Sequence, residues 1–104
     1  MLTAVYLLLA ILFEVAGTTS MKLSYGFTQL IPSICIFVFY SFAFIFLTLS
    51  LKRLEVSIAY AIWSGLGTLL IAVIGFVFFK ETMSAVKIAS LMLIIVGVVG
   101  LKLG

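Results

Sequence analysis

The chain has 104 residues, of which 66% are hydrophobic and only 9% are charged, whereas soluble domains carry roughly a quarter charged residues. This composition excludes a water-soluble globular enzyme. With no His, no Asp and one Cys, the chain cannot form a His-based metal site, a Ser-His-Asp triad or an internal disulfide. The basic residues behind its net charge of +3 are scattered along the chain, which gives little support to nucleic-acid binding.

Four apolar runs account for most of the chain, at about residues 2–20, 30–51, 56–79 and 85–103. The hydrocarbon core of a membrane is about 30 Å thick, so a helix needs ~20 apolar residues to cross it. Each run is long enough, and the short connections make successive helices antiparallel neighbours. The sequence therefore predicts an all-α integral membrane protein, residues 1–104 forming a single domain of four transmembrane helices. We expect no enzymatic activity, no metal and no cofactor.

The first run contains one acidic residue, Glu14, and no basic residue. Glu14 lies about two-thirds of the way along this run. A carboxylate at that depth is costly unless it is protonated or accompanied by a cation, so protons and cations become alternatives at the same group. Helical spacing places the small residues Ala10, Gly17 and Thr18 on the same face, which leaves room beside the carboxylate. Another interpretation is a protonated Glu14 that only forms a hydrogen bond to a neighbouring helix.

Aromatic residues share faces on the next two runs, with Tyr40 on the second and Tyr60, Trp63 and Ser64 on the third. Aromatic faces near a desolvated carboxylate suit an apolar cation, through cation–π attraction. Aromatic belts at the membrane interface are the alternative explanation.

Gly65 and Gly67 weaken the third helix. We place a kink or hinge there, although glycines also allow close helix packing.

The fourth run is aliphatic, with Ser90 and Gly97 on one face suited to self-association. If both termini lie on one side of the membrane, the loop charges divide three against three, Lys52, Arg53 and Lys102 against Lys22, Lys80 and Lys87. The positive-inside rule then favours neither orientation, and two oppositely oriented copies can pair as an antiparallel dimer. Such a dimer brings two Glu14 side chains to one site that holds either protons or a cation. Competition of this kind would allow the protein to exchange protons for cations, which is antiport.

One string of residues closely resembles the small multidrug resistance family. It comprises Glu14, Gly17-Thr18, Lys22-x-Ser24-x-Gly26-Phe27-Thr28, Pro32-Ser33 and the run from Ala59 to Gly67 (AYAIWSGLG). The resemblance implies a bacterial inner-membrane, proton-coupled exporter of drug-like cations, working as an antiparallel dimer in which protons and substrate compete for the two copies of Glu14. It further implies that Trp63, Tyr60 and Tyr40 line the binding site, that the Gly65–Gly67 segment bends, and that the fourth helix is the main dimer contact.

Within that family, Ala16-Gly17 and Ser64 favour the quaternary-ammonium multidrug branch over the guanidinium exporters. The stretch from Lys52 to Ser57 looks more like members that work as two-gene pairs, so a paired heterodimer stays open beside the homodimer. Guanidinium export is the alternative within the family. A non-transporting membrane assembly subunit is the alternative of another class, and a lone carboxylate with no ring of coordinating groups disfavours an ion channel.

Overall fold

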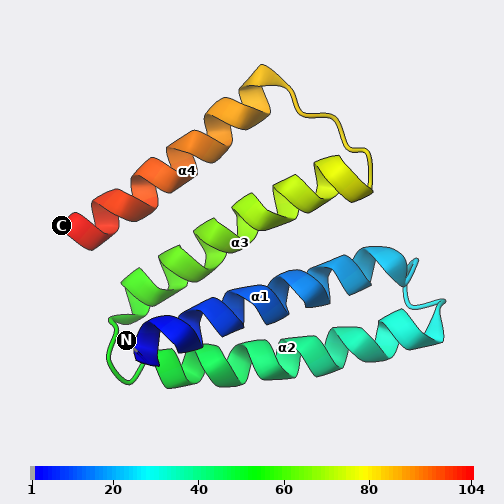
Figure 1. Ribbon diagram of the computed structural model, residues 1–104, viewed down its shortest axis with the longest axis horizontal. Helices are drawn as coiled ribbons and strands as arrows, with labels where there is room; N and C mark the ends of the chain where they lie inside the picture. Colours follow the sequence, from blue (N-terminus) through cyan, green and yellow to red (C-terminus); the bar gives the residue numbers. More distant parts are fainter. Residues whose placement is uncertain (1) are drawn as a thin grey trace.

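The computed structural model describes residues 2–104 and contains four helices joined by short loops (Figure 1). The helices are α1 (Leu2–Leu23), α2 (Leu30–Ser50), α3 (Val56–Phe78) and α4 (Ala85–Leu103). Each helix is long and apolar enough to cross a membrane. The prediction of an all-α fold with four membrane-spanning helices is therefore confirmed.

Helix α1 extends three residues beyond the apolar run, which was expected to end near Ser20. The residues from 21 to 23 include no Gly or Pro, so the helical hydrogen bonds continue, and the Ser24 N–H donates to the Ser20 carbonyl at 2.9 Å. The chain turns away only where Tyr25, Gly26 and Phe27 adopt φ values of 48°, 72° and 69°. Glu14 consequently lies just past the middle of α1 rather than two-thirds of the way along it.

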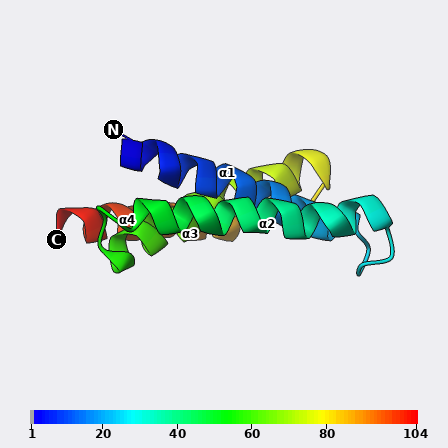
Figure 2. The same ribbon diagram turned by 90° about the horizontal axis from the view of Figure 1, so that it is seen from below.

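The four helices form a single layer in the order α2, α1, α3, α4 (Figure 1). Helix α1 packs against α2 on one side and α3 on the other, α2 meets α3 only marginally, and among the described residues α4 packs on α3 alone. The molecule measures 43 × 35 × 18 Å, and the view along the layer shows how thin it is (Figure 2). One copy of the chain therefore leaves broad helix faces uncovered.

Helix α1 is fixed by apolar contacts on both sides. Toward α2, the Phe13 ring stacks on Phe42 and Phe46 with centroids 5.2 and 5.7 Å apart, and such pairs contribute about 0.5–1.5 kcal/mol each beyond their buried area. On α1, Leu7, Ile11 and Val15 form a buried core, packed mainly against α3 residues that include Ile62, Trp63, Leu70, Ile71 and Ile74. Glu14 is thus carried by the best anchored helix.

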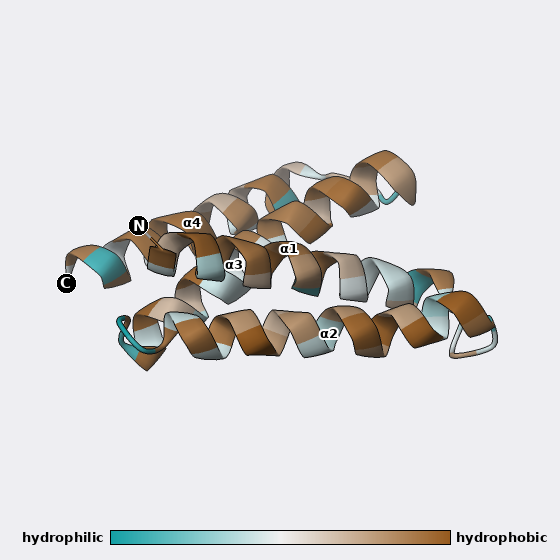
Figure 3. Ribbon diagram, turned by 60° about the horizontal axis from the view of Figure 1, so that its bottom comes forward, coloured by the Kyte–Doolittle hydropathy of each residue, from teal (hydrophilic) through white to brown (hydrophobic). Residues whose placement is uncertain are grey.

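The polar residues gather at the ends of the layer. The α1–α2 and α3–α4 loops lie at one end, while both ends of the chain and the α2–α3 loop lie at the other (Figure 1). Figure 3 shows hydrophobic residues along most of each helix and hydrophilic ones mainly at helix ends and loops. Large side chains such as Phe37 and Leu93 remain 66% and 71% exposed. A surface of this kind suits lipid or partner helices rather than water.

Candidate functional site

The Glu14 carboxylate is held by a chain of hydroxyl groups that reaches from α1 to α2. Its Oε1 accepts a hydrogen bond from Thr18 Oγ1 at 3.0 Å, and the Thr18 hydroxyl is also hydrogen-bonded to the Tyr40 hydroxyl. A hydroxyl has one proton to donate. When the carboxylate is charged it can only accept, so Thr18 donates its proton to Glu14 and Tyr40 is the donor to Thr18. The hydrogen bonds therefore point in one direction, from Tyr40 through Thr18 to the carboxylate.

The second carboxylate oxygen is in a different situation. Glu14 Oε2 is buried and forms no hydrogen bond within the described part of the chain. It lies over Gly67 of α3, where a β-carbon would stand only 2.9 Å from it. The indole Nε1 of Trp63 is likewise buried and without a hydrogen-bond partner among residues 2–104. Buried polar atoms without partners are costly, so Glu14 and Trp63 mark this region as the candidate site.

A cavity of about 240 Å³ lies between α1 and α3, and Glu14 and Trp63 are both among the residues that line it. Its walls come from seven residues, namely Glu14, Thr18, Trp63, Ser64, Gly67, Thr68 and Ile71. A larger cavity of about 560 Å³ lies elsewhere, but it is lined mostly by aliphatic side chains and includes no carboxylate. The smaller cavity is thus the one that combines a membrane-buried acid with an aromatic wall.

Aromatic rings continue from the cavity toward α2. Tyr60 meets Trp63 edge to face with centroids 5.4 Å apart, Trp63 lies 6.4 Å from Phe44, and Phe44 lies 5.9 Å from Tyr40. Trp63 lines the cavity, while Tyr40 reaches the carboxylate through Thr18. Tyr60 is 58% exposed and stands behind Trp63, outside the cavity walls. The structure therefore brings the three predicted aromatic residues into one cluster, with unequal access to Glu14.

The small residues expected around Glu14 occupy different places. Thr18 and Ser64 line the cavity, whereas Ala10 and Gly17 are buried and do not. At Gly17 a β-carbon would stand 2.7 Å from the Tyr40 ring, so this glycine makes room for Tyr40 rather than for a ligand. Thr68 and Ile71 were not singled out from the sequence. Thr68 and Ile71 continue the helical face of Ser64 by four and seven residues, and extending that face would have found them.

The two α3 glycines face different neighbours. Gly67 adjoins Glu14, whereas at Gly65 a β-carbon would stand 2.6 Å from Val98 Cγ2 of α4. Helix α3 runs without interruption through both positions, and a hinge there stays a prediction. Ser90 and Gly97 are exposed on α4. Apart from the adjacent residues and backbone of α4 itself, no described atom lies within 4 Å of a β-carbon placed at Gly97.

Known membrane proteins resemble this chain over nearly its whole length. The family model described as Small Multidrug Resistance protein matches residues 2–94. An uncharacterized membrane protein, YvaE of Bacillus subtilis, is 61% identical over 99 residues, which cover 95% of this chain and 83% of YvaE. Multidrug resistance protein EbrB of the same species is 50% identical over 97 residues, covering 93% of this chain and 83% of EbrB. The quaternary ammonium compound-resistance protein QacC of Staphylococcus aureus is 40% identical over 99 residues, covering 95% and 92%.

A further relative is a guanidinium exporter of Yersinia pseudotuberculosis, 38% identical over 99 residues that cover 95% of each chain. Four membrane-spanning helices and bacterial relatives of this kind define an integral protein of the bacterial plasma membrane, a transport protein and not an enzyme. The chain belongs to the small multidrug resistance family.

Proposed function

We propose that the chain exports hydrophobic and quaternary-ammonium cations in exchange for protons, and that both compete for Glu14. The observation that carries this proposal is the asymmetry of the carboxylate in a residue that lines the cavity, with Oε1 held by Thr18 and Oε2 without a hydrogen-bond partner in the described chain. A quaternary ammonium ion has no N–H to donate, so it needs a free negative charge and an aromatic face. Glu14 and Trp63 supply both. A proton on the carboxyl group removes the charge, and with it the attraction for the drug.

The size of the cavity supports a dimer as the working unit. Ligand sites for drug-sized molecules measure about 300–1,000 Å³, and one copy offers about 240 Å³ in a layer only one helix thick. We propose that two oppositely oriented copies close a shared site between their Glu14 residues, with a homodimer preferred over a paired heterodimer. Helix α4 has no buried residue, which suits it as the contact between copies, with Ser90 and Gly97 at the interface.

The remaining site residues are assigned supporting roles. Tyr40 and Thr18 hold the charged carboxylate by the directed hydrogen bonds, and Trp63, backed by Tyr60, forms the wall against the cation. Ser64 lines the cavity, and the small size of Ala10 and Gly17 allows the helices of the site to pack closely. The segment from Gly65 to Gly67 is the proposed hinge for alternating access.

Export of guanidinium is the second candidate, because the chain matches a guanidinium exporter along 95% of that relative's length. A guanidinium ion donates N–H groups, which Glu14 Oε2 and the Ser64 hydroxyl oxygen can accept. It needs less room and no aromatic wall. Uptake of guanidinium into proteoliposomes by a chain that fails to bind a lipophilic quaternary cation would favour this candidate.

The proposal is tested by equilibrium binding of tetraphenylphosphonium to the purified chain in detergent. Trp63 is the only tryptophan, so its fluorescence reports the site directly. We expect quenching that weakens as the pH is lowered and that is lost in Glu14→Gln, while the control Glu55→Gln behaves like the native chain. Binding that ignores both the pH and the Glu14 substitution would separate Glu14 from the site and favour a membrane assembly subunit.

A further inference from the structure

A second cavity continues from the Glu14 cavity toward one end of the helix layer. Its volume is about 170 Å³, and its walls are Thr18, Thr19, Lys22, Ile71, Ile74, Gly75, Phe79 and Glu81. Thr18 and Ile71 line both cavities, so the two adjoin. Eight residues separate Glu14 from Lys22, which is about 12 Å along the axis of α1. The two neighbouring cavities, which we call the route, extend from Glu14 toward the end that carries the α1–α2 and α3–α4 loops.

Glu81 is placed at the outer end of this route by the backbone that follows α3. Lys80 adopts a left-handed φ of 56°, which turns the chain back so that the Glu81 N–H donates to the Gly75 carbonyl at 2.9 Å. The Glu81 carboxylate then lies directly against the Cα of Gly75, in space that any side chain at that position would fill. The absence of a side chain at Gly75 therefore allows the carboxylate to fold over the last turn of α3.

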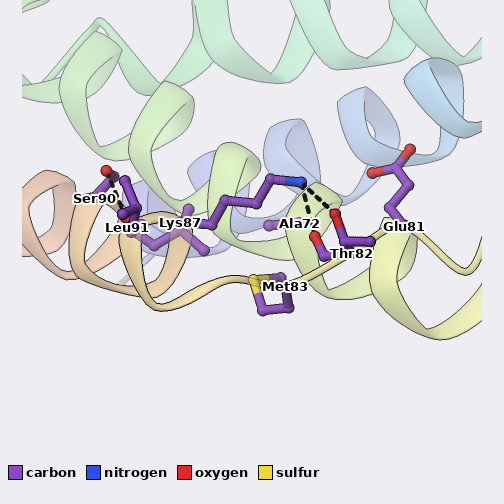
Figure 4. A pocket seen from close by; sticks show the side chains of 8 residues that line it. Ala72, Glu81, Thr82, Met83, Lys87, Ser90 and Leu91 are labelled. Atoms are coloured by element: carbon purple, nitrogen blue, oxygen red, sulfur yellow. Dashed lines mark hydrogen bonds between the residues drawn. The ribbon is translucent and has the colours of Figure 1, made fainter.

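Three basic residues lie near Glu81. Lys80 precedes it in the chain, Lys87 lines a different cavity with it, and Lys22 of α1 lines the cavity of the route with it. Lys87 of α4 donates from Nζ to the Thr82 carbonyl at 2.8 Å and to Thr82 Oγ1 at 3.3 Å, and Figure 4 shows the Glu81 carboxylate turned away from this contact. Glu81 is thus the acidic residue in the walls of this cavity, and it lowers the net positive charge at the mouth of the route.

We propose that Glu81 is an access residue, which determines how readily positively charged substrates reach Glu14 through this mouth. A narrow mouth bearing an ammonium group alone would repel a cation, whereas a carboxylate beside it removes the repulsion and raises the local cation concentration. In an antiparallel pair each membrane face would carry one such mouth, so the same residue would serve uptake and release. This inference rests on the proposed exchange of cations at Glu14.

The test measures uptake of tetraphenylphosphonium into proteoliposomes under a pH gradient, for the native chain and Glu81→Gln. The matched control is Glu55→Gln, a loop carboxylate at the opposite end of the layer. We expect Glu81→Gln to raise KM about three- to tenfold at low ionic strength with kcat unchanged, and the effect to shrink in high salt, where charges are screened beyond a few ångströms. The equilibrium Kd from Trp63 fluorescence should stay within about twofold, because the bound cation lies far from the mouth.

A second variant distinguishes an effect of the Glu81 charge from an effect on the structure of the α3–α4 loop. Adding Lys22→Gln to Glu81→Gln restores the net charge that the mouth has in the native chain, so KM should recover toward the native value. A loss of transport that is independent of salt and is not restored by Lys22→Gln would overturn the proposal, since it would show that Glu81 only braces the α3–α4 loop. Native KM in Glu81→Gln would overturn it equally. If Glu14→Gln still transports tetraphenylphosphonium, the proposed exchange at Glu14 fails instead, whatever Glu81 does.

Discussion

The contact between Gly67 and Glu14 leads to a sharp prediction for Gly67→Ala. The added β-carbon would stand 2.9 Å from Glu14 Oε2, about 0.5 Å inside ordinary van der Waals contact. The atom that it meets is the far end of a flexible side chain, so the carboxylate will swing aside while the helices stay in place. The variant should therefore insert and fold normally, with its defect confined to the site.

The size of the defect follows from the hydrogen bond that the movement disrupts. Swinging the carboxylate away from α3 disturbs the 3.0 Å bond from Thr18 to Oε1. A hydrogen bond to a charged group is worth about 1.5–3 kcal/mol, which corresponds to roughly a 10- to 100-fold loss of affinity. We expect this loss for tetraphenylphosphonium in the Trp63 fluorescence assay at a pH where native binding is maximal.

Gly100→Ala is the matched control, because no described atom outside the adjacent residues and backbone of α4 lies within 4 Å of a β-carbon at Gly100. It makes the same chemical change in a membrane-spanning helix and should leave binding unaltered. Native affinity in Gly67→Ala, with the native response to pH, would refute the reasoning. It would mean that the carboxylate does not use the space that Gly67 leaves open.

Three further variants test the contacts around the site. Thr18→Val removes the hydroxyl that donates to the carboxylate and should lower cation affinity about tenfold in the fluorescence assay, whereas Thr18→Ser keeps the donor and should bind normally. Gly17→Ala places a β-carbon 2.7 Å from the Tyr40 ring. This overpacking should lower the free energy of unfolding by about 1–3 kcal/mol in detergent. An unchanged unfolding midpoint would contradict the packing of Gly17 against Tyr40. Gly65→Ala meets Val98 Cγ2 at 2.6 Å and should be destabilised similarly, with recovery when Val98→Ala is added.

Much of the fold follows from the sequence for a simple physical reason. A lipid bilayer requires about 20 apolar residues per helix, so hydropathy and length determine the number and approximate bounds of the helices. Hydropathy and length do not predict where α1 ends. Backbone hydrogen bonding, and not hydropathy, decides where a helix stops, and the left-handed residues that end α1 begin only at Tyr25.

The candidate site, like the fold, could be predicted from the sequence only in part. Thr18 lies four residues after Glu14, so helical spacing alone places its hydroxyl on the carboxylate face. The contact of Gly67 with Oε2 depends on the register between α1 and α3, which no periodicity within one helix specifies. The same limit explains Gly17, whose position on the Glu14 face does not reveal that the Tyr40 ring fills the space beside it.

Exchange itself is measured most directly in proteoliposomes that contain a pH-sensitive dye. An inside-acidic pH gradient should drive tetraphenylphosphonium inward while protons leave, for the native chain and for the control Glu55→Gln. Glu14→Gln should show neither flux, although it inserts and dimerises. Tetraphenylphosphonium uptake that ignores the pH gradient, or exchange by Glu14→Gln at the native rate, would contradict the account of Glu14 as the group for which proton and cation compete.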